Sequence, residues 1–251
     1  MTYFANTSLS HEHSLDILSL LYGYDSFLDG LVTIADMGCG AGLDAQWWAT
    51  LETRDDPPEP RNYKVYAVDR SLKHVDQDLR RISNISWIEE DFETEGILPQ
   101  LVDLMWCHDS FQFAINPLQT LAKWNRQMNV NGMLVMAIPQ SIDYHYNRLS
   151  FRSHNYSYYN YTISNLVYML AVNGFDCLDA YFYKNAQTNW IYLAVYKNIG
   201  PLNPAETSWF DLADKNLLHP SVIDSLNKYG HVRQEDLIYP WLDKDFYRAK
   251  T

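Results

Sequence analysis

A short run of glycines behind an acidic residue is the clearest candidate for chemistry in this chain. It reads IADMGCGAG at residues 34–42, where Gly38, Gly40 and Gly42 alternate with other residues directly after an apolar run. Glycines in such a position let the backbone approach a ligand closely. The stretch therefore predicts a binding loop, and its spacing and its acid indicate which ligand the loop takes.

The loop does not have the pattern of a phosphate-binding loop. A dinucleotide loop reads G-x-G-x-x-G, whereas the third glycine here, Gly42, comes one residue too early. A P-loop would close on Gly-Lys-Ser/Thr, and GLDAQ at residues 42–46 has no lysine. Asp36, two residues before the first glycine, would repel a pyrophosphate and attract a cation. We therefore expect a ligand that carries positive charge.

Two further acids follow at the ends of later apolar runs. Asp69 closes YAVD, and an acid at this point can accept two hydrogen bonds from ribose hydroxyls. Asp91 stands in EEDFET, where its carboxylate could accept from an adenine amino group and Phe92 could cover the ring. A ligand with a cation, a ribose and a base, and with no need for phosphate, fits S-adenosylmethionine.

Alternating apolar runs predict the elements that must position these residues. Strands are expected at residues 31–38, 63–69, 85–92, 101–107 and 133–139, the last entered through a turn at Asn131-Gly132. Helices are expected after Ser10 and at residues 43–52, 71–81, 117–128 and 162–175. Two last strands, at residues 176–183 and 189–197, should pair as a hairpin.

This alternation predicts an α/β fold: a doubly wound, Rossmann-like, seven-stranded sheet, mostly parallel with an antiparallel last strand. Residues 1–199 are expected to form the cofactor-binding domain, with an aromatic lid insert at about residues 141–161. After the linker GPLNP, residues 200–251 carry short helical signals, and they are expected to form a C-terminal helical extension.

The glycine loop and the three acids, in this order and in these elements, resemble the class I S-adenosylmethionine-dependent methyltransferases. That family has D/E-x-G-x-G-x-G after its first strand, an acid closing the second strand and an acid near the end of the third. The resemblance spans about residues 10 to 198 and implies S-adenosylmethionine as the cofactor. The cofactor-binding residues it implies are Asp36, Gly38, Cys39, Gly40, Gly42, Asp69, Arg70, Asp91, Phe92 and Cys107.

In this family the segment after strand four lines the reaction centre, and here it reads WCHDSFQFAINP. His108 is the predicted catalytic residue, as a base or a substrate hydrogen-bond partner, because imidazole titrates near working pH. The alternative is that His108 only orders the loop or touches the cofactor. HDSFQF is also similar to the N-x-x-L-Q-W stretch of small-carboxylate O-methyltransferases, with Gln112 and Phe113 matching and His108 or Asp109 in place of the Asn.

The aromatic insert is the expected site of the acceptor. Arg148 and Arg152 are four residues apart, so on a helix they would share a face and could clamp a carboxylate. Tyrosines of the insert, among them Tyr144, could stack on an aromatic acceptor. Together with Gln112 these are the predicted substrate-binding residues. The plainer interpretation is a lid that packs by aromatic burial, with its arginines facing water.

The composition of the chain indicates which classes of binding partner to expect. The formal net charge of −12 disfavours nucleic acid. Three cysteines, far apart and without CxxC spacing, fit a reducing cytoplasm, and no spacing indicates a metal site. No apolar stretch approaches the ~20 residues of a membrane span. We expect a cytoplasmic protein with a small-molecule acceptor, and a homodimer is left open.

The predicted function is methyl transfer from S-adenosylmethionine to a small molecule, at the oxygen of a carboxylate or a phenol. One alternative is an RNA or protein methyltransferase, which would need a basic groove beside the cofactor. Another is a cofactor-binding subunit without catalysis, with the aromatic residues of the C-terminal extension as its interface.

Overall fold

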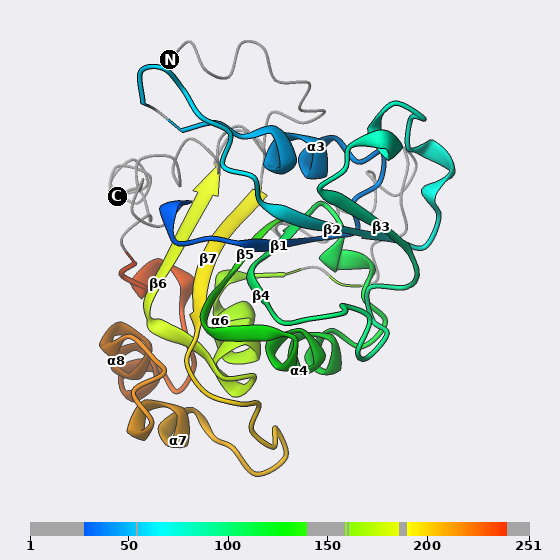
Figure 1. Ribbon diagram of the computed structural model, residues 1–251. Coiled ribbons are helices and arrows are strands. Elements are labelled where there is room, and N and C mark those ends of the chain that lie inside the picture. The colour runs from blue at the N-terminus through cyan, green and yellow to red at the C-terminus, as the bar shows by residue number, and fades with distance from the viewer. Residues whose placement is uncertain (1–27, 54, 140–158, 160, 186–189, 240–251) are drawn as a thin grey trace.

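A seven-stranded sheet forms the centre of the molecule (Figure 1). The computed structural model describes residues 28–53, 55–139, 159, 161–185 and 190–239, so the helix expected after Ser10 lies outside the described residues. The strand order is β3-β2-β1-β4-β5-β7-β6. The strands are β1 (Thr33–Met37), β2 (Lys64–Asp69), β3 (Ile85–Glu89), β4 (Val102–His108), β5 (Met128–Pro139), β6 (Phe175–Asn185) and β7 (Trp190–Lys197).

The predicted sheet is confirmed in its number of strands and in their directions. β1 pairs in parallel with β2 and β4, β2 with β3, and β4 with β5. β7 is antiparallel to both of its neighbours, β5 and β6. All five residues of β1 are buried, as expected for a central parallel strand that is covered on both faces.

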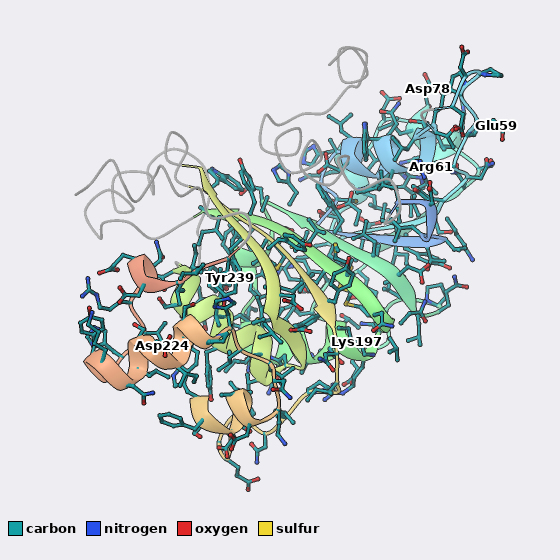
Figure 2. All side chains as sticks on the ribbon, turned by 90° about the vertical axis from the view of Figure 1, so that its left-hand side faces the viewer. Glu59, Arg61, Asp78, Lys197, Asp224 and Tyr239 are labelled. Carbon is teal, nitrogen blue, oxygen red and sulfur yellow. The ribbon has the colours of Figure 1, made fainter. Side chains whose placement is uncertain are left out.

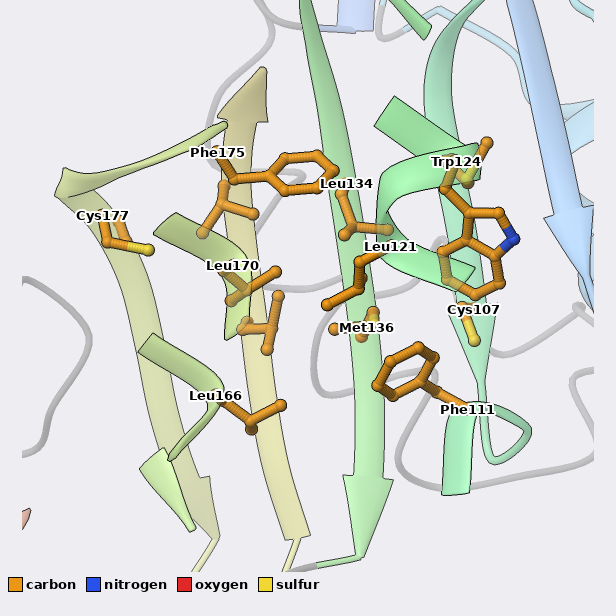
Figure 3. Close-up of a cluster of buried hydrophobic side chains, with 14 of the residues drawn as sticks. Cys107, Phe111, Leu121, Trp124, Leu134, Met136, Leu166, Leu170, Phe175 and Cys177 are labelled. Atoms are coloured by element: carbon orange, nitrogen blue, oxygen red, sulfur yellow. The ribbon is translucent and has the colours of Figure 1, made fainter. Parts of the chain in front are cut away.

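Helices cover both faces of this sheet (Figure 1). The described α-helices are α3 (Leu43–Thr50), α4 (Pro117–Arg126), α6 (Ile163–Val172), α7 (Trp209–Asp214) and α8 (Pro220–Tyr229). Trp48 of α3 packs against Trp106 of β4 on one face. On the other face Leu121 and Trp124 of α4 meet Leu166 and Leu170 of α6 in a second core cluster (Figure 3).

Two local predictions are wrong. Residues 71–81 form two short 3-10 turns, η1 (Leu72–His74) and η2 (Leu79–Arg81), rather than a helix. Most of their side chains are exposed and polar, so no apolar stripe holds a helix against the sheet. The turn expected at Asn131-Gly132 lies inside β5, which begins at Met128. Asn131 has a left-handed φ of +62°, and it lies where the pairing register between β5 and β4 shifts.

The described part of the C-terminal extension packs on the edge strand β6 (Figures 1 and 2). The N–H of Cys177 donates to the carbonyl of Leu217 at 3.0 Å, and the N–H of His219 donates to the carbonyl of Cys177 at 3.1 Å. The ring of Tyr239 lies 4.8 Å from that of Phe182 on β6, centroid to centroid. A domain boundary at residue 199 stays a prediction, but the described residues on its two sides share one core cluster.

Candidate active site

The glycine loop joins the end of β1 to α3, and its three glycines have different surroundings. All three have left-handed φ angles: +84° at Gly38, +53° at Gly40 and +82° at Gly42. A Cβ on Gly38 would lie 2.3 Å from Ser110 Cβ, and one on Gly42 would lie 2.5 Å from the ring of Trp87. A Cβ on Gly40 would meet no described atom within 4 Å. The outer glycines are therefore needed for packing, whereas Gly40 faces space that a ligand can fill.

A cavity of about 230 Å³ opens at the carboxyl ends of β1 and β4, beside this loop. In an open α/β sheet this is the end at which ligands bind. Five of the predicted site residues line it: Asp36, Gly38, Cys39, Gly40 and His108. Four residues that were not predicted also line it: Ala41, Leu43, Asp44 and Asp109.

Asp36 is a buried acid without a cation near it among the described residues. Its carboxylate accepts from the N–H of Ala45, and Oδ2 has no hydrogen-bond partner in the described part of the chain. Burial, together with the negative charges of Asp44 and Asp69, raises the pKa of Asp36 well above its usual value. A positively charged group in the cavity would relieve this penalty, so the site suits a cationic ligand.

Asp69 holds the glycine loop in place. Its Oδ2 accepts from the N–H of Gly40 at 2.9 Å, and its Oδ1 accepts from the N–H of Ser71 at 3.1 Å. Each carboxylate oxygen can accept more than one hydrogen bond, so these contacts leave room for the predicted ribose hydroxyls. The ribose contact itself stays a prediction.

Arg70 and Asp91 pair with each other. Arg70 Nε lies 3.0 Å from Asp91 Oδ2, and Asp91 Oδ1 accepts from the N–H of Glu93 at 2.9 Å. Phe92 is 5% exposed and packs edge-on against Trp124 at 5.7 Å, so most of its ring lies in the core rather than on an open surface. The predicted contacts of these residues with adenine remain predictions, as does the contact of Gly42.

The two cysteines predicted to touch the cofactor have different places. Cys39 lines the cavity, while Cys107 is fully buried among Phe111 and Trp124, with Sγ 3.1 Å from the Oγ of Ser110 (Figure 3). Burial raises the pKa of the Cys39 thiol strongly and that of Cys107 to about 12. Both thiols are therefore protonated at neutral pH and are poor nucleophiles.

Gln112 is the one predicted substrate-binding residue that the structure describes. It lies in the 3-10 turn η3 (Phe111–Phe113), is 2% exposed, and donates from Nε2 to Asp109 Oδ1 at 2.6 Å. Its Oε1 has no hydrogen-bond partner among the described residues. Tyr144, Arg148 and Arg152 lie outside the described residues.

His108, the predicted catalytic residue, ends β4 and lines the cavity. Its ring stacks on that of Trp190 from β7 with centroids 5.8 Å apart. Its Nδ1 lies 3.5 Å from Oδ2 of Asp44, a residue that the sequence analysis did not select. An acid in the first turn of a helix is common because it complements the helix dipole, so its type alone gave no signal of this contact.

Metal binding and membrane insertion are the two other properties that the described residues bear on. Within the described ranges, no group of three or more His, Cys, Asp or Glu side chains is arranged to hold a metal ion. None of the helices in those ranges is long and apolar enough to cross a membrane.

Comparison with known proteins supports the family resemblance. Residues 35–136 match the model of a family described as a methyltransferase domain. A stretch of 106 residues is 30% identical to malonyl-[acyl-carrier protein] O-methyltransferase 2 of Coxiella burnetii, covering 42% of this chain and 40% of that protein. The alignment thus spans less than half of the relative's length.

Solved structures agree in fold. The N-methyltransferase NodS from Bradyrhizobium japonicum WM9 superposes with a TM-score of 0.52 and 13% identity, covering 76% of this chain and 99% of that one. The magnesium protoporphyrin IX methyltransferase from Synechocystis PCC 6803, solved with bound SAH, gives 0.53 and 15%, covering 73% and 81%. Residues 35–136 thus match a methyltransferase domain model, and the solved methyltransferase structures share the fold of this chain.

Proposed function

We propose that this chain transfers a methyl group from S-adenosylmethionine to a small-molecule acceptor at oxygen. The observation that carries the proposal is one cavity that combines a buried acid, Asp36, with the open face of Gly40 and the imidazole of His108. The methyltransferase domain match over residues 35–136 supports the same reaction class.

The residues of the cavity fit the cofactor. Asp36, whose Oδ2 has no hydrogen-bond partner among the described residues, would hold the ammonium group. Gly40 would allow close approach of the loop backbone, and Asp69 would accept from the ribose hydroxyls while it fixes the loop. When bound, S-adenosylmethionine supplies a methyl group on a positively charged sulfur, so the protein has mainly to align the acceptor and exclude water.

The acceptor that we favour is a small carboxylate. The relative from Coxiella burnetii is named for methyl transfer to the oxygen of a malonyl group, and HDSFQF in this chain is similar to a stretch of small-carboxylate O-methyltransferases. A carboxylate is ionised at neutral pH and needs no base, so His108 would hold it in the imidazolium form, by a hydrogen bond from a ring N–H. A phenol would instead require His108 to take up its proton.

The cofactor site is tested by calorimetric titration of the chain with S-adenosylmethionine. Asp69→Ala should weaken binding at least about tenfold, because it removes a charged acceptor for the ribose and the contact that holds Gly40. Glu95→Gln is the matched control, since it also removes one negative charge but lies in an exposed ion pair with Arg126. Unchanged affinity in Asp69→Ala would overturn the assignment of this residue.

The reaction is tested by incubating the protein with methyl-labelled S-adenosylmethionine and a panel of small dicarboxylates, malonyl thioesters and phenols. Label should appear in a base-labile ester of one of the carboxylates. Transfer to phenols alone would overturn the carboxylate as acceptor. Tight cofactor binding without transfer to any small molecule would favour a binding subunit without catalysis.

A further inference from the structure

A buried contact between α3 and β4 joins Asp44, Trp106 and His108. Trp106 and His108 are two residues apart on one strand, so their side chains point to the same face of the sheet, the face covered by α3. Cys107, between them, points to the opposite face and packs with α4. Asp44, in the first turn of α3, reaches the space between the two rings.

One carboxylate oxygen serves both rings. Oδ2 of Asp44 accepts a hydrogen bond from Trp106 Nε1 at 3.0 Å and lies 3.5 Å from His108 Nδ1. Both Asp44 and His108 are 8% exposed, and Trp106 is 1% exposed, so the arrangement is shielded from water. The first turn of a helix favours a negative charge, which helps Asp44 to stay ionised in this place.

We propose that Asp44 is a positioning residue, which holds the imidazole of His108 at the cavity with Nδ1 turned toward α3. Trp106 fixes the carboxylate, and Trp190 stacks on the imidazole at 5.8 Å. Asp44 thus contacts the edge of the imidazole ring, and Trp190 contacts its face. A carboxylate next to one ring nitrogen selects the tautomer with its proton on that nitrogen and makes the other nitrogen more basic.

The contact itself can be tested without an acceptor. The probe is the side-chain ¹⁵N and ¹³C spectrum of histidine-labelled protein over a pH titration, with the His108 signals assigned by their loss in His108→Gln. In the wild-type protein the neutral ring should carry its proton on Nδ1. Asp44→Asn should move the titration of His108 to lower pH, because it removes the negative charge beside the ring.

Other titratable groups also line the cavity and bear on this titration. Asp36 from β1 and Asp109 after β4 line the same cavity as His108, and so does the protonated thiol of Cys39. Glu95→Gln is again the control, and it should leave the His108 signals unchanged because Glu95 pairs with Arg126 on an exposed surface. An equal His108 titration in the wild type and Asp44→Asn would overturn the proposal.

The catalytic consequence rests on the proposed function and needs an acceptor that turns over. Asp44→Asn should lower kcat by about 10- to 100-fold with little change in the dissociation constant of S-adenosylmethionine. In a His108→Gln background the same substitution should cause no further loss, because Asp44 acts through His108. Equal losses in the two backgrounds would show a structural role and overturn the proposal.

Trp106→Phe tests the same contact by a second variant, in case Asp44→Asn does not fold. It removes the indole donor but retains an aromatic ring, so the carboxylate remains beside His108 with less restraint. We expect a smaller loss of kcat and a mixture of the two tautomers. A single Nε2-protonated tautomer in the folded wild-type protein would contradict the inference, whereas absence of turnover with the expected tautomer would contradict only the proposed function.

Discussion

Three aspartates around the glycine loop have the same chemistry and different tasks. Asp69 is bound to the loop backbone, and Asp44 is bound to Trp106. Asp36 is the most deeply buried of the three, and the other two charges act on it. An ionised Asp36 is therefore unfavourable for stability at the place where a cationic ligand would bind, which is a common compromise between stability and function.

This compromise predicts a change in stability for Asp36→Asn. The folded state binds the Asp36 proton more tightly than the unfolded chain, because burial raises the pKa of Asp36. The stability that this group contributes is thus full below the usual carboxyl pKa and is lost as pH rises through the raised pKa. At pH 8 we expect Asp36→Asn to increase the free energy of unfolding by about 1–3 kcal/mol.

Urea denaturation of the two proteins at pH 4 and pH 8 measures this effect. The difference between wild type and Asp36→Asn should grow with pH, and the same substitution should weaken binding of S-adenosylmethionine. A difference that shrinks as pH rises would contradict the assigned sign.

The sequence indicated some of these residues and not others. Asp36, Gly40 and Asp69 could be selected because the glycine spacing and the strand ends mark them within the chain. Asp44 could not, because its hydrogen bond to Trp106 joins residues 62 positions apart, and only the packing of α3 on β4 brings them together. Contacts of this kind depend on tertiary structure and leave no local pattern.

The loop between β1 and α3 is the element on which the site depends. Its backbone is anchored to β2, since the N–H groups of Gly38 and Cys39 donate to the carbonyl of Val68 at 2.8 and 2.9 Å. Gly40 therefore lines the cavity on a loop whose backbone is fixed by hydrogen bonds. Gly38 and Gly42 lie against the side chains of Ser110 and Trp87.

This division predicts different effects for two alanine substitutions. Gly40→Ala should cost about 1–2 kcal/mol of stability from its left-handed φ, and it should block close approach of the cofactor. Gly38→Ala should cost more stability, since its Cβ would also lie 2.3 Å from Ser110 Cβ. Thermal unfolding and cofactor titration together check this, and an equal loss of stability in the two variants would contradict it.

Elements with a clear apolar pattern were the ones that the sequence predicted well. The helices α4 and α6 follow from apolar periodicity, because each buries a face against the sheet, and α3 follows from its place after the first strand. The polar residues 71–81 have no such pattern, and helix propensity alone did not make a helix there. The irregular start of β5 depends on its register with β4, which is not visible in one strand's sequence.

At the scale of the molecule, the described C-terminal residues form part of the core. Leu212, Leu217 and Val222 are fully buried in the cluster that also contains Phe175 of β6 and Val167 of α6. Leu217 and His219 also bond to the backbone of Cys177 and so cover part of the edge of the sheet. The sequence of the C-terminal extension indicated short helices, but it did not indicate that their side chains are buried in the core.

Leu217→Ala tests how far the protein depends on this packing. Its side chain is fully buried, so we expect a loss of about 2–5 kcal/mol in the free energy of unfolding. Phe210→Ala is the control in the same extension, because Phe210 is 54% exposed on α7 and should change stability by less than about 0.5 kcal/mol. Similar values for the two variants, from urea denaturation, would show that the extension is not part of the cooperative core.

The place of these residues in the chain has a consequence for synthesis on the ribosome. The strands of the sheet are all made before Leu212, Leu217 and Val222, so the core cluster at β6 and α6 is complete only after these residues have left the ribosome. Until then, the apolar side chains around Phe175 lack these packing partners. The core beside the candidate site can therefore reach its final packing only after residue 222 has been translated.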